Sequence, residues 1–209
     1  MLINTLTESP ITFFAVFLSI VYALTIHEYA HAYAASELGD QTAKYSGRLS
    51  LNPLAHMEFF GTLMLLVAGF GWGKPVPVNP YNLKYKRWGE AIVAMSGPAA
   101  NFLSVALFLS IYHVAIQHYA PTNMLVLVLL YLIVVNAILG VFNLLPLPPL
   151  DGSKVLFAIL PDSWEVFKQK LAINGPWILL VLIILDNLGK VNILGSLFGL
   201  VVNFLEKLL

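Results

Sequence analysis

Three long runs of apolar residues limit what this chain can fold into more than any other feature of the sequence. They cover residues 11–26, 91–119 and 124–145, and the first continues in weaker form to Leu38. A helix needs about 20 residues to cross a bilayer, so each run is long enough or nearly so. With 59% hydrophobic residues and a mean hydropathy of +0.82, the chain is far more apolar than a soluble domain. We therefore expect an all-α polytopic membrane protein, with about 4–6 transmembrane helices around a three-helix core.

Two further apolar segments do not have the length of a simple crossing. Residues 59–72 number only about 14, which favours a short re-entrant segment over a full span. Residues 176–208 are interrupted at Asp186 and again at Gly189, so they form either one long interrupted helix or two short C-terminal hydrophobic helices.

The connecting segments carry turn signals. Residues 40–56 form a polar stretch in which Gly47, Asn52 and Pro53 are turn signals, with β-like pieces around residues 45–51. The prolines of residues 146–149 stop the third apolar run, and residues 151–173 have the pattern of an amphipathic helix at the membrane surface. No internal repeat divides the chain, so we expect residues 1–209 to form a single domain.

The positions of the charged residues predict the orientation. Eleven basic residues balance eleven acidic ones, which gives no net field to attract nucleic acid. Basic residues are absent before residue 11 and from the turn between the second and third runs, but they gather in residues 39–90 and again in residues 147–175. The positive-inside rule then places both basic loops in the cytoplasm and the N-terminus outside. Residues 59–72 must consequently enter the membrane and return on the same side.

The segment "HEYAH" places ionisable groups near the cytoplasmic end of the first run. His27 and His31 are four positions apart and share one helix face, so both imidazoles can reach one metal ion, with Glu28 beside them. Such a pattern is typical of zinc proteases, in which the Glu takes a proton from water. Ionisable side chains within a span are costly, which favours a site over chance. A membrane metal-ion transporter is the alternative, since intramembrane His and carboxylates also mark ion pathways; histidines that only pack between helices, or an inactive scaffold, explain Glu28 poorly.

Zinc bound by two histidines needs a third protein ligand, and Asp151 is the candidate. The first and third runs both cross from outside to inside, so Asp151 reaches the same leaflet as His27. No cysteine is available as a ligand. Asn143, on the last turns of the third run, either assists a developing oxyanion or packs as a buried amide. In "SGPAAN", at residues 96–101, structural roles in helix packing are favoured.

Together these motifs resemble the site-2 proteases, a family of intramembrane zinc metalloproteases. The resemblance covers roughly residues 20–160 and rests on "HEYAH", "SGPAAN" and "NLLPLPPLDG" in the family's order, supported by "LGD", "GRLSLNPLAH" and "KPVPVNP". It implies one Zn²⁺ per chain held by His27, His31 and Asp151, with Glu28 as general base and Asn143 as an assisting polar group. One departure is Glu58-Phe59, where many short members have Asp-Pro.

The resemblance also implies a place and partners for the protein. We expect a catalytic core over about residues 11–160 of a multi-pass protein, in the plasma membrane of a prokaryote, with the active site toward the cytoplasm. Its substrate would be a helix of another membrane protein, surrounded by the lipid bilayer and cleaved within or near its transmembrane segment. No PDZ-like domain is expected, and the oligomeric state stays open.

Overall fold

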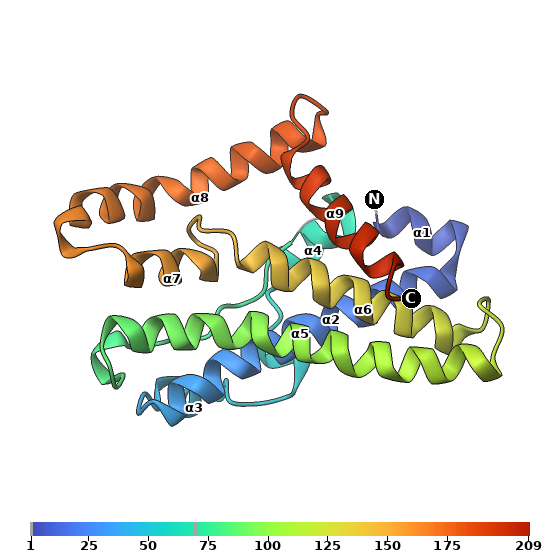
Figure 1. Ribbon diagram of the computed structural model, residues 1–209, viewed down its shortest axis with the longest axis horizontal. Helices are drawn as coiled ribbons and strands as arrows, with labels where there is room; N and C mark the ends of the chain where they lie inside the picture. Colours follow the sequence, from blue (N-terminus) through green and yellow to red (C-terminus); the bar gives the residue numbers. More distant parts are fainter. Residues whose placement is uncertain (1, 69–70) are drawn as a thin grey trace.

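A computed structural model describes residues 2–68 and 71–209, and its elements are almost entirely helical (Figure 1). Three long helices form the centre: α2 (Pro10–Glu37), α5 (Arg87–His118) and α6 (Met124–Asn143). The remaining helices are α1 (Leu2–Glu8), α3 (Thr42–Tyr45), α4 (Phe59–Ala68), α7 (Asp151–Ile159), α8 (Glu165–Asn187) and α9 (Ile193–Glu206), with short 3-10 turns η1 (Pro53–Ala55), η2 (Pro80–Asn82) and η3 (Asp162–Trp164).

The three central helices pack pairwise on one another and run side by side in Figure 1. Small residues line their contacts: Ala15, Ala23 and Ala32 on α2 and Ala94 on α5 are all buried. Lipid tails are as apolar as Leu, so helices in a bilayer gain little from burying large apolar side chains and instead associate through close contact at small ones. The small-residue contacts therefore bring α2 and α5 near enough for side chains of one to meet the backbone of the other.

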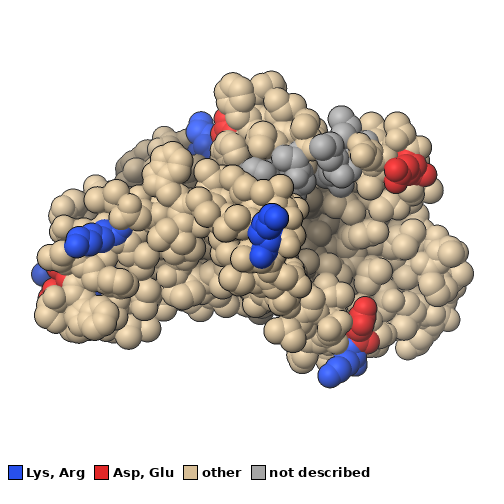
Figure 2. Space-filling model, turned by 90° about the horizontal axis from the view of Figure 1, so that it is seen from above, with Lys and Arg blue, Asp and Glu red and all other residues tan. Residues whose placement is uncertain are grey.

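Four helical segments are long and apolar enough to cross a membrane: α2, α5, α6 and the segment from Asp162 through the end of α8. Large apolar side chains on their outer faces are exposed, including Phe14, Leu103 and Trp177. On the face shown in Figure 2 the surface is mainly uncharged, with only scattered Lys, Arg, Asp and Glu. The chain is thus an all-α integral membrane protein, as the apolar runs predicted.

The segment after the first span begins and ends at neighbouring residues. Met57 and Gly73 form an isolated antiparallel bridge, and a Cβ built on Gly61 would lie 2.0 Å from the carbonyl oxygen of Trp72. The chain therefore leaves along α4 and comes back to its starting point, as expected for a re-entrant segment. Part of the predicted segment, residues 69–70, lies outside the described residues.

The prediction of β-like pieces around residues 45–51 is wrong, because the described residues contain no strand. Their first part is instead the end of α3, where the N–H groups of Tyr45 and Ser46 bond to Gln41 and Thr42 in helical fashion. A buried carboxylate, Asp40, accepts from the Thr42 N–H and starts this turn. Local bonds thus satisfy the backbone that a partner strand would otherwise have to satisfy.

The C-terminal region also differs from the sequence prediction. The expected amphipathic helix over residues 151–173 is split into α7 and α8 near Pro161, and α8 continues through Pro176 into the C-terminal apolar stretch. Gly175, the residue before Pro176, lies against Pro148: a Cβ built on Gly175 would be 2.8 Å from the ring of Pro148. α8 therefore packs closely against the proline-rich turn after α6 at this point. The later break is present: the Asp186 carboxylate accepts from the Ile193, Leu194 and Gly195 N–H groups and so starts α9. The C-terminal region therefore holds two helices.

Candidate metal centre

His27 and His31 lie one turn apart on α2 and point into the three-helix bundle. Their rings are 4.5 Å apart between centroids, and the residues are only 3% and 7% exposed. The two Nε2 atoms approach to 3.0 Å. The four-residue spacing in the sequence has thus placed both imidazoles on one buried face, as a helix requires.

The proton of each imidazole is fixed by what its other nitrogen contacts. Nδ1 of His31 lies 2.7 Å from the carbonyl oxygen of Val93, which can only accept. Nδ1 of His27 lies 2.7 Å from Oδ1 of Asn101, whose amide nitrogen donates to Ala23 and Asn136 and thereby fixes the amide orientation. Both Nδ1 atoms must therefore donate, and in the neutral form that binds a metal each ring carries its lone pair on Nε2, facing the other ring.

Asp151 brings a carboxylate to the same point from a separate helix, α7. It is the first residue of α7, and its Oδ2 lies 3.1 Å from Nε2 of His27 and 3.0 Å from Nε2 of His31. Its other oxygen, Oδ1, lies 3.5 Å from Nζ of Lys154, one turn along α7. The carboxylate thus turns one oxygen toward the imidazoles and the other toward a cation.

These three donor atoms fit a zinc ion. With both Nδ1 atoms protonated and both rings neutral, two lone pairs and a carboxylate oxygen face one another within about 3 Å, an arrangement in which all three groups repel unless a cation lies among them. Ligands bound tetrahedrally at about 2.0 Å lie about 3.3 Å apart, close to the observed separations. Among the described residues, His27, His31 and Asp151 are the group that could hold a metal ion. Neutral imidazole and carboxylate are also ligands that zinc accepts.

Gly97 explains why α5 can lie so close to the two imidazoles. A Cβ built on it would be 2.6 Å from Nε2 of His31 and 2.7 Å from Cε1 of His27. Any side chain there would displace a ring, so the "SGP" motif leaves room for the site. Gly152, next to Asp151, has a similar role: a Cβ there would lie 2.2 Å from the carbonyl oxygen of Leu144.

Glu28 lies on α2 directly after His27, and its carboxylate contacts the loop that follows the re-entrant segment. Its Oε2 accepts a hydrogen bond of 3.0 Å from the backbone N–H of Val76, in the loop that follows the re-entrant segment. The residue is half-buried. The structure thus places a carboxylate beside the metal-binding group and connects it to the backbone of that loop.

Asn143 is not brought into this group. Its side-chain amide donates to the carbonyl oxygen of Leu139 on its own helix. Within the described residues it makes no hydrogen bond to the metal-binding side chains or to Glu28. Asn101, and not Asn143, is the amide that contacts the site. From the sequence alone, only a structural role in helix packing was predicted for the motif that contains Asn101. A polar residue inside an apolar span was the available signal, but only the fold shows that its partner is His27.

The amino-acid sequence of the chain is similar to that of known peptidases. The model of peptidase family M50 matches residues 108–184, a segment that includes Asp151 but not the two histidines. YwhC of Bacillus subtilis, a candidate zinc metalloprotease, is 39% identical over 153 residues, which cover 70% of this chain and 69% of that protein. No solved structure matches significantly.

More distant relatives carry similar names. Rip2 of Mycolicibacterium smegmatis, a candidate zinc metalloprotease, is 29% identical over 86% of this chain and 70% of its own length. The zinc metalloprotease MJ0392 of Methanocaldococcus jannaschii is 26% identical over 90% of this chain, which spans 47% of that protein. Together with the His-His-Asp group, these similarities show that the chain is a zinc metalloprotease of peptidase family M50, the site-2 protease family.

Proposed function

We propose that the protein is an intramembrane zinc metalloendopeptidase that hydrolyses peptide bonds within or near the transmembrane segments of other membrane proteins. The observation that carries the proposal is the position of its site: two metal-binding histidines and Glu28 lie on α2, a helix long and apolar enough to span the bilayer. One zinc ion per chain, held by His27, His31 and Asp151, is part of the proposal.

The residues of the site have different roles in the proposed hydrolysis. Zinc in such a site lowers the pKa of water and polarises the carbonyl group to be attacked. Glu28 accepts the proton of the attacking water at its carboxylate and passes it to the leaving amine. Asn101 and the Val93 carbonyl hold the two imidazoles in the tautomer that keeps both Nε2 atoms free. Asn143 as an oxyanion donor stays a proposal, since its amide would have to leave Leu139 first.

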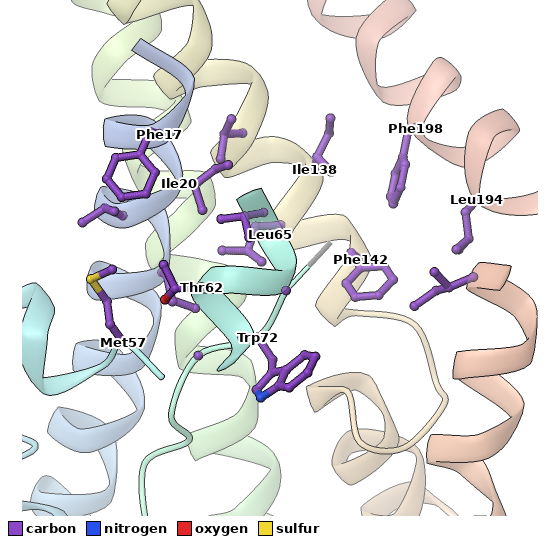
Figure 3. Close-up of a pocket in the computed structure, with 18 of the residues that line it drawn as sticks. Phe17, Ile20, Met57, Thr62, Leu65, Trp72, Ile138, Phe142, Leu194 and Phe198 are labelled. Atoms are coloured by element: carbon purple, nitrogen blue, oxygen red, sulfur yellow. The ribbon is translucent and has the colours of Figure 1, made fainter. Parts of the chain in front are cut away.

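An apolar cavity beside the site supports a membrane-embedded substrate. It has a volume of about 550 Å³ and lies between α2, the re-entrant segment, α6 and the α8–α9 corner (Figure 3). Leu24, one turn before Glu28, and Gly73, three residues before Val76, line its wall. Phe17, Phe142 and Phe198 also face it. An apolar side chain from a substrate would be bound here with its backbone close to Glu28.

The basic residues support the proposed orientation. Lys74 and Arg87, which flank the loop next to Glu28, lie in the stretch that the positive-inside rule places in the cytoplasm. We therefore propose a site that opens toward the cytoplasm of a prokaryotic plasma membrane. A substrate helix has to unwind locally before its peptide bonds can be attacked, because its backbone groups are otherwise bonded within the helix.

The test compares wild-type protein with Glu28→Gln. Membrane peptides from cells that express either form are compared by mass spectrometry, and zinc is measured in both purified proteins. We expect cleaved transmembrane segments only with the wild type and equal zinc in both, because Gln keeps the shape of Glu but cannot accept the proton.

Three results would contradict the proposal. Equal cleavage by Glu28→Gln would remove this residue from the mechanism. Cleavage of casein, an unstructured soluble chain, without any transmembrane fragment in cells would leave a zinc protease that does not act on membrane substrates. Metal flux in liposomes that persists in Glu28→Gln would instead favour a transporter.

A further inference from the structure

The extended segment of residues 73–78, "GKPVPV", is held by hydrogen bonds from more than one neighbouring segment. On one edge, the Lys74 N–H donates to the carbonyl oxygen of His56 at 2.8 Å. On another, the buried guanidinium of Arg48 donates to the carbonyl oxygens of Ala55 and Pro75, the latter at 3.2 Å. Arg48 and His56 belong to "GRLSLNPLAH", a motif that the metal site does not use.

The prolines of this segment leave very few backbone donors. Pro75 and Pro77 have no N–H, so Val76 supplies the only one between Lys74 and Val78. A residue before proline is confined to extended conformations, which straightens Lys74 and Val76. In extended chain, alternate residues turn their N–H groups to the same edge. The edge that bonds His56 through Lys74 therefore presents the Val76 N–H next, and this group bonds Glu28.

We propose that Val76 is a positioning residue of the protease, whose backbone N–H holds the Glu28 carboxylate in place for proton transfer. The inference rests on the proposed role of Glu28 as proton acceptor. The alternating prolines make the register unique: a shift by one residue would place Pro75 or Pro77 at Glu28 and leave its carboxylate without this donor. Arg48 and His56 act at a distance by preventing that shift.

Substitution of Val76 by proline removes the donor and keeps an apolar side chain. With zinc-loaded protein and casein as substrate, we expect kcat to fall by about 10- to 100-fold, the range expected for one hydrogen bond to a charged group. KM and zinc content should stay unchanged, since neither depends on this bond. Val78→Pro is the matched control: it adds a proline two residues further on, where no hydrogen bond among the described residues is lost, and it should keep wild-type kcat.

A second measurement does not depend on the folding of a proline variant. The sequence contains only two Pro-Val pairs, 75–76 and 77–78, so labelling proline with 13C at the carbonyl and valine with 15N isolates the amides of Val76 and Val78 in the NMR spectrum. In zinc-loaded protein, Glu28→Ala should move the Val76 amide proton upfield and leave that of Val78 in place.

The outcomes separate this inference from the proposed function. If wild-type protein cleaves casein, Glu28→Gln does not, and Val76→Pro cleaves at the wild-type rate, the positioning role is wrong while the protease stands. Equal movement of both amides in Glu28→Ala would overturn it as well. Failure of the wild type to cleave any substrate would contradict the proposed function and not the hydrogen bond, which the NMR experiment would still report.

Discussion

The helical bundle around the histidines and the loop beside Glu28 hold neighbouring side chains of one helix by different means. His27 and His31 are fixed by α5, through Asn101 and the Val93 carbonyl, in the buried interior of the helical bundle. Glu28 is fixed by the N–H of Val76, in a loop without regular structure. Metal binding therefore depends on helix packing, whereas the position of the proton acceptor depends on loop geometry.

This difference predicts that the two functions can be lost separately. A change in the bundle should lower zinc affinity, and activity should fall with it. A change in the loop should lower kcat while zinc stays bound. A protein in which one rigid unit held all three side chains would lose both properties together, so measuring zinc and kcat on the same samples tests the comparison directly.

Removal of Asp151 should have the largest effect on the bundle side. Asp151→Ala leaves only two protein ligands and an unfilled space beside two lone pairs, so zinc affinity should fall by more than about 100-fold and cleavage should be abolished. Zinc content after dialysis against a weak chelator checks this. Asp162→Ala, at an exposed carboxylate in η3 beyond the far end of α7, is the control and should keep its zinc. Unchanged stoichiometry in Asp151→Ala would exclude it as a ligand.

Replacement of Asn101 should have a smaller effect of the same kind. Asn101→Leu removes the acceptor for Nδ1 of His27, so the ring loses its fixed tautomer, and we expect a loss of about 10- to 100-fold in zinc affinity. Competition with a fluorescent chelator measures it. Asn143→Leu should leave zinc affinity unchanged, because among the described residues the Asn143 amide bonds to Leu139 of its own helix and to none of the metal-binding side chains. Equal zinc affinity in Asn101→Leu and wild type would show that packing alone orients His27.

Much of the helical bundle and its metal-binding residues could be predicted from the sequence, because apolar runs and the spacing of the histidines follow the helical period. Helical spacing placed His27 and His31 on one face, and the direction of the spans brought Asp151 to them. The partner of each imidazole could not be predicted, since the contact between Asn101 and His27 depends on how α2 and α5 are rotated about their own axes when they pack. That choice depends on close contacts such as the one at Gly97, which no periodicity records.

The loop side was predicted less well for a related reason. Residues 45–51 have the composition of strands, but a strand needs a partner edge, and the N–H groups of residues 45–48 bond instead to carbonyl oxygens of residues 41–44. The buried side chains of Asp40 and Arg48 bond other parts of the loop backbone. Single polar side chains that organise a loop give no repeating pattern. The bond between Val76 and Glu28 joins residues 48 positions apart and has no sequence signal beyond the alternating prolines.

On the loop side, Arg48→Met should lower kcat without loss of zinc. It removes the bonds to Ala55 and Pro75 while keeping the apolar part of the side chain, so the segment loses one support but keeps the Lys74 bond to His56. We expect a fall of about 3- to 10-fold in kcat on casein. Arg87→Met, which removes only an exposed ion pair with Asp162, is the control and should behave as wild type. A parallel loss of zinc in Arg48→Met would show that loop and bundle are coupled.

The smallest effect should appear at low pH, through Asp40. This carboxylate accepts bonds from Thr42, the Asn79 N–H and the Asn82 side chain, and so ties the loop to the end of α2. Burial by itself would raise the pKa of Asp40, but these hydrogen bonds outweigh it and hold the pKa below its usual value. A carboxyl with a depressed folded-state pKa stabilises the fold above its unfolded pKa of about 4, and the stabilisation is lost as pH falls through the folded value.

Amide hydrogen exchange of residues 79–85 measures this effect. In the wild type, exchange corrected for its intrinsic pH dependence should increase below about pH 4, whereas Asp40→Asn should exchange faster at neutral pH and show no such increase. The amides of α5 near Asn101 should show the same protection in both proteins, because the bundle does not depend on Asp40. If Asp40→Asn also weakened protection there, the loop would be part of the same cooperative unit as the metal site, and the separation between the two regions would not hold.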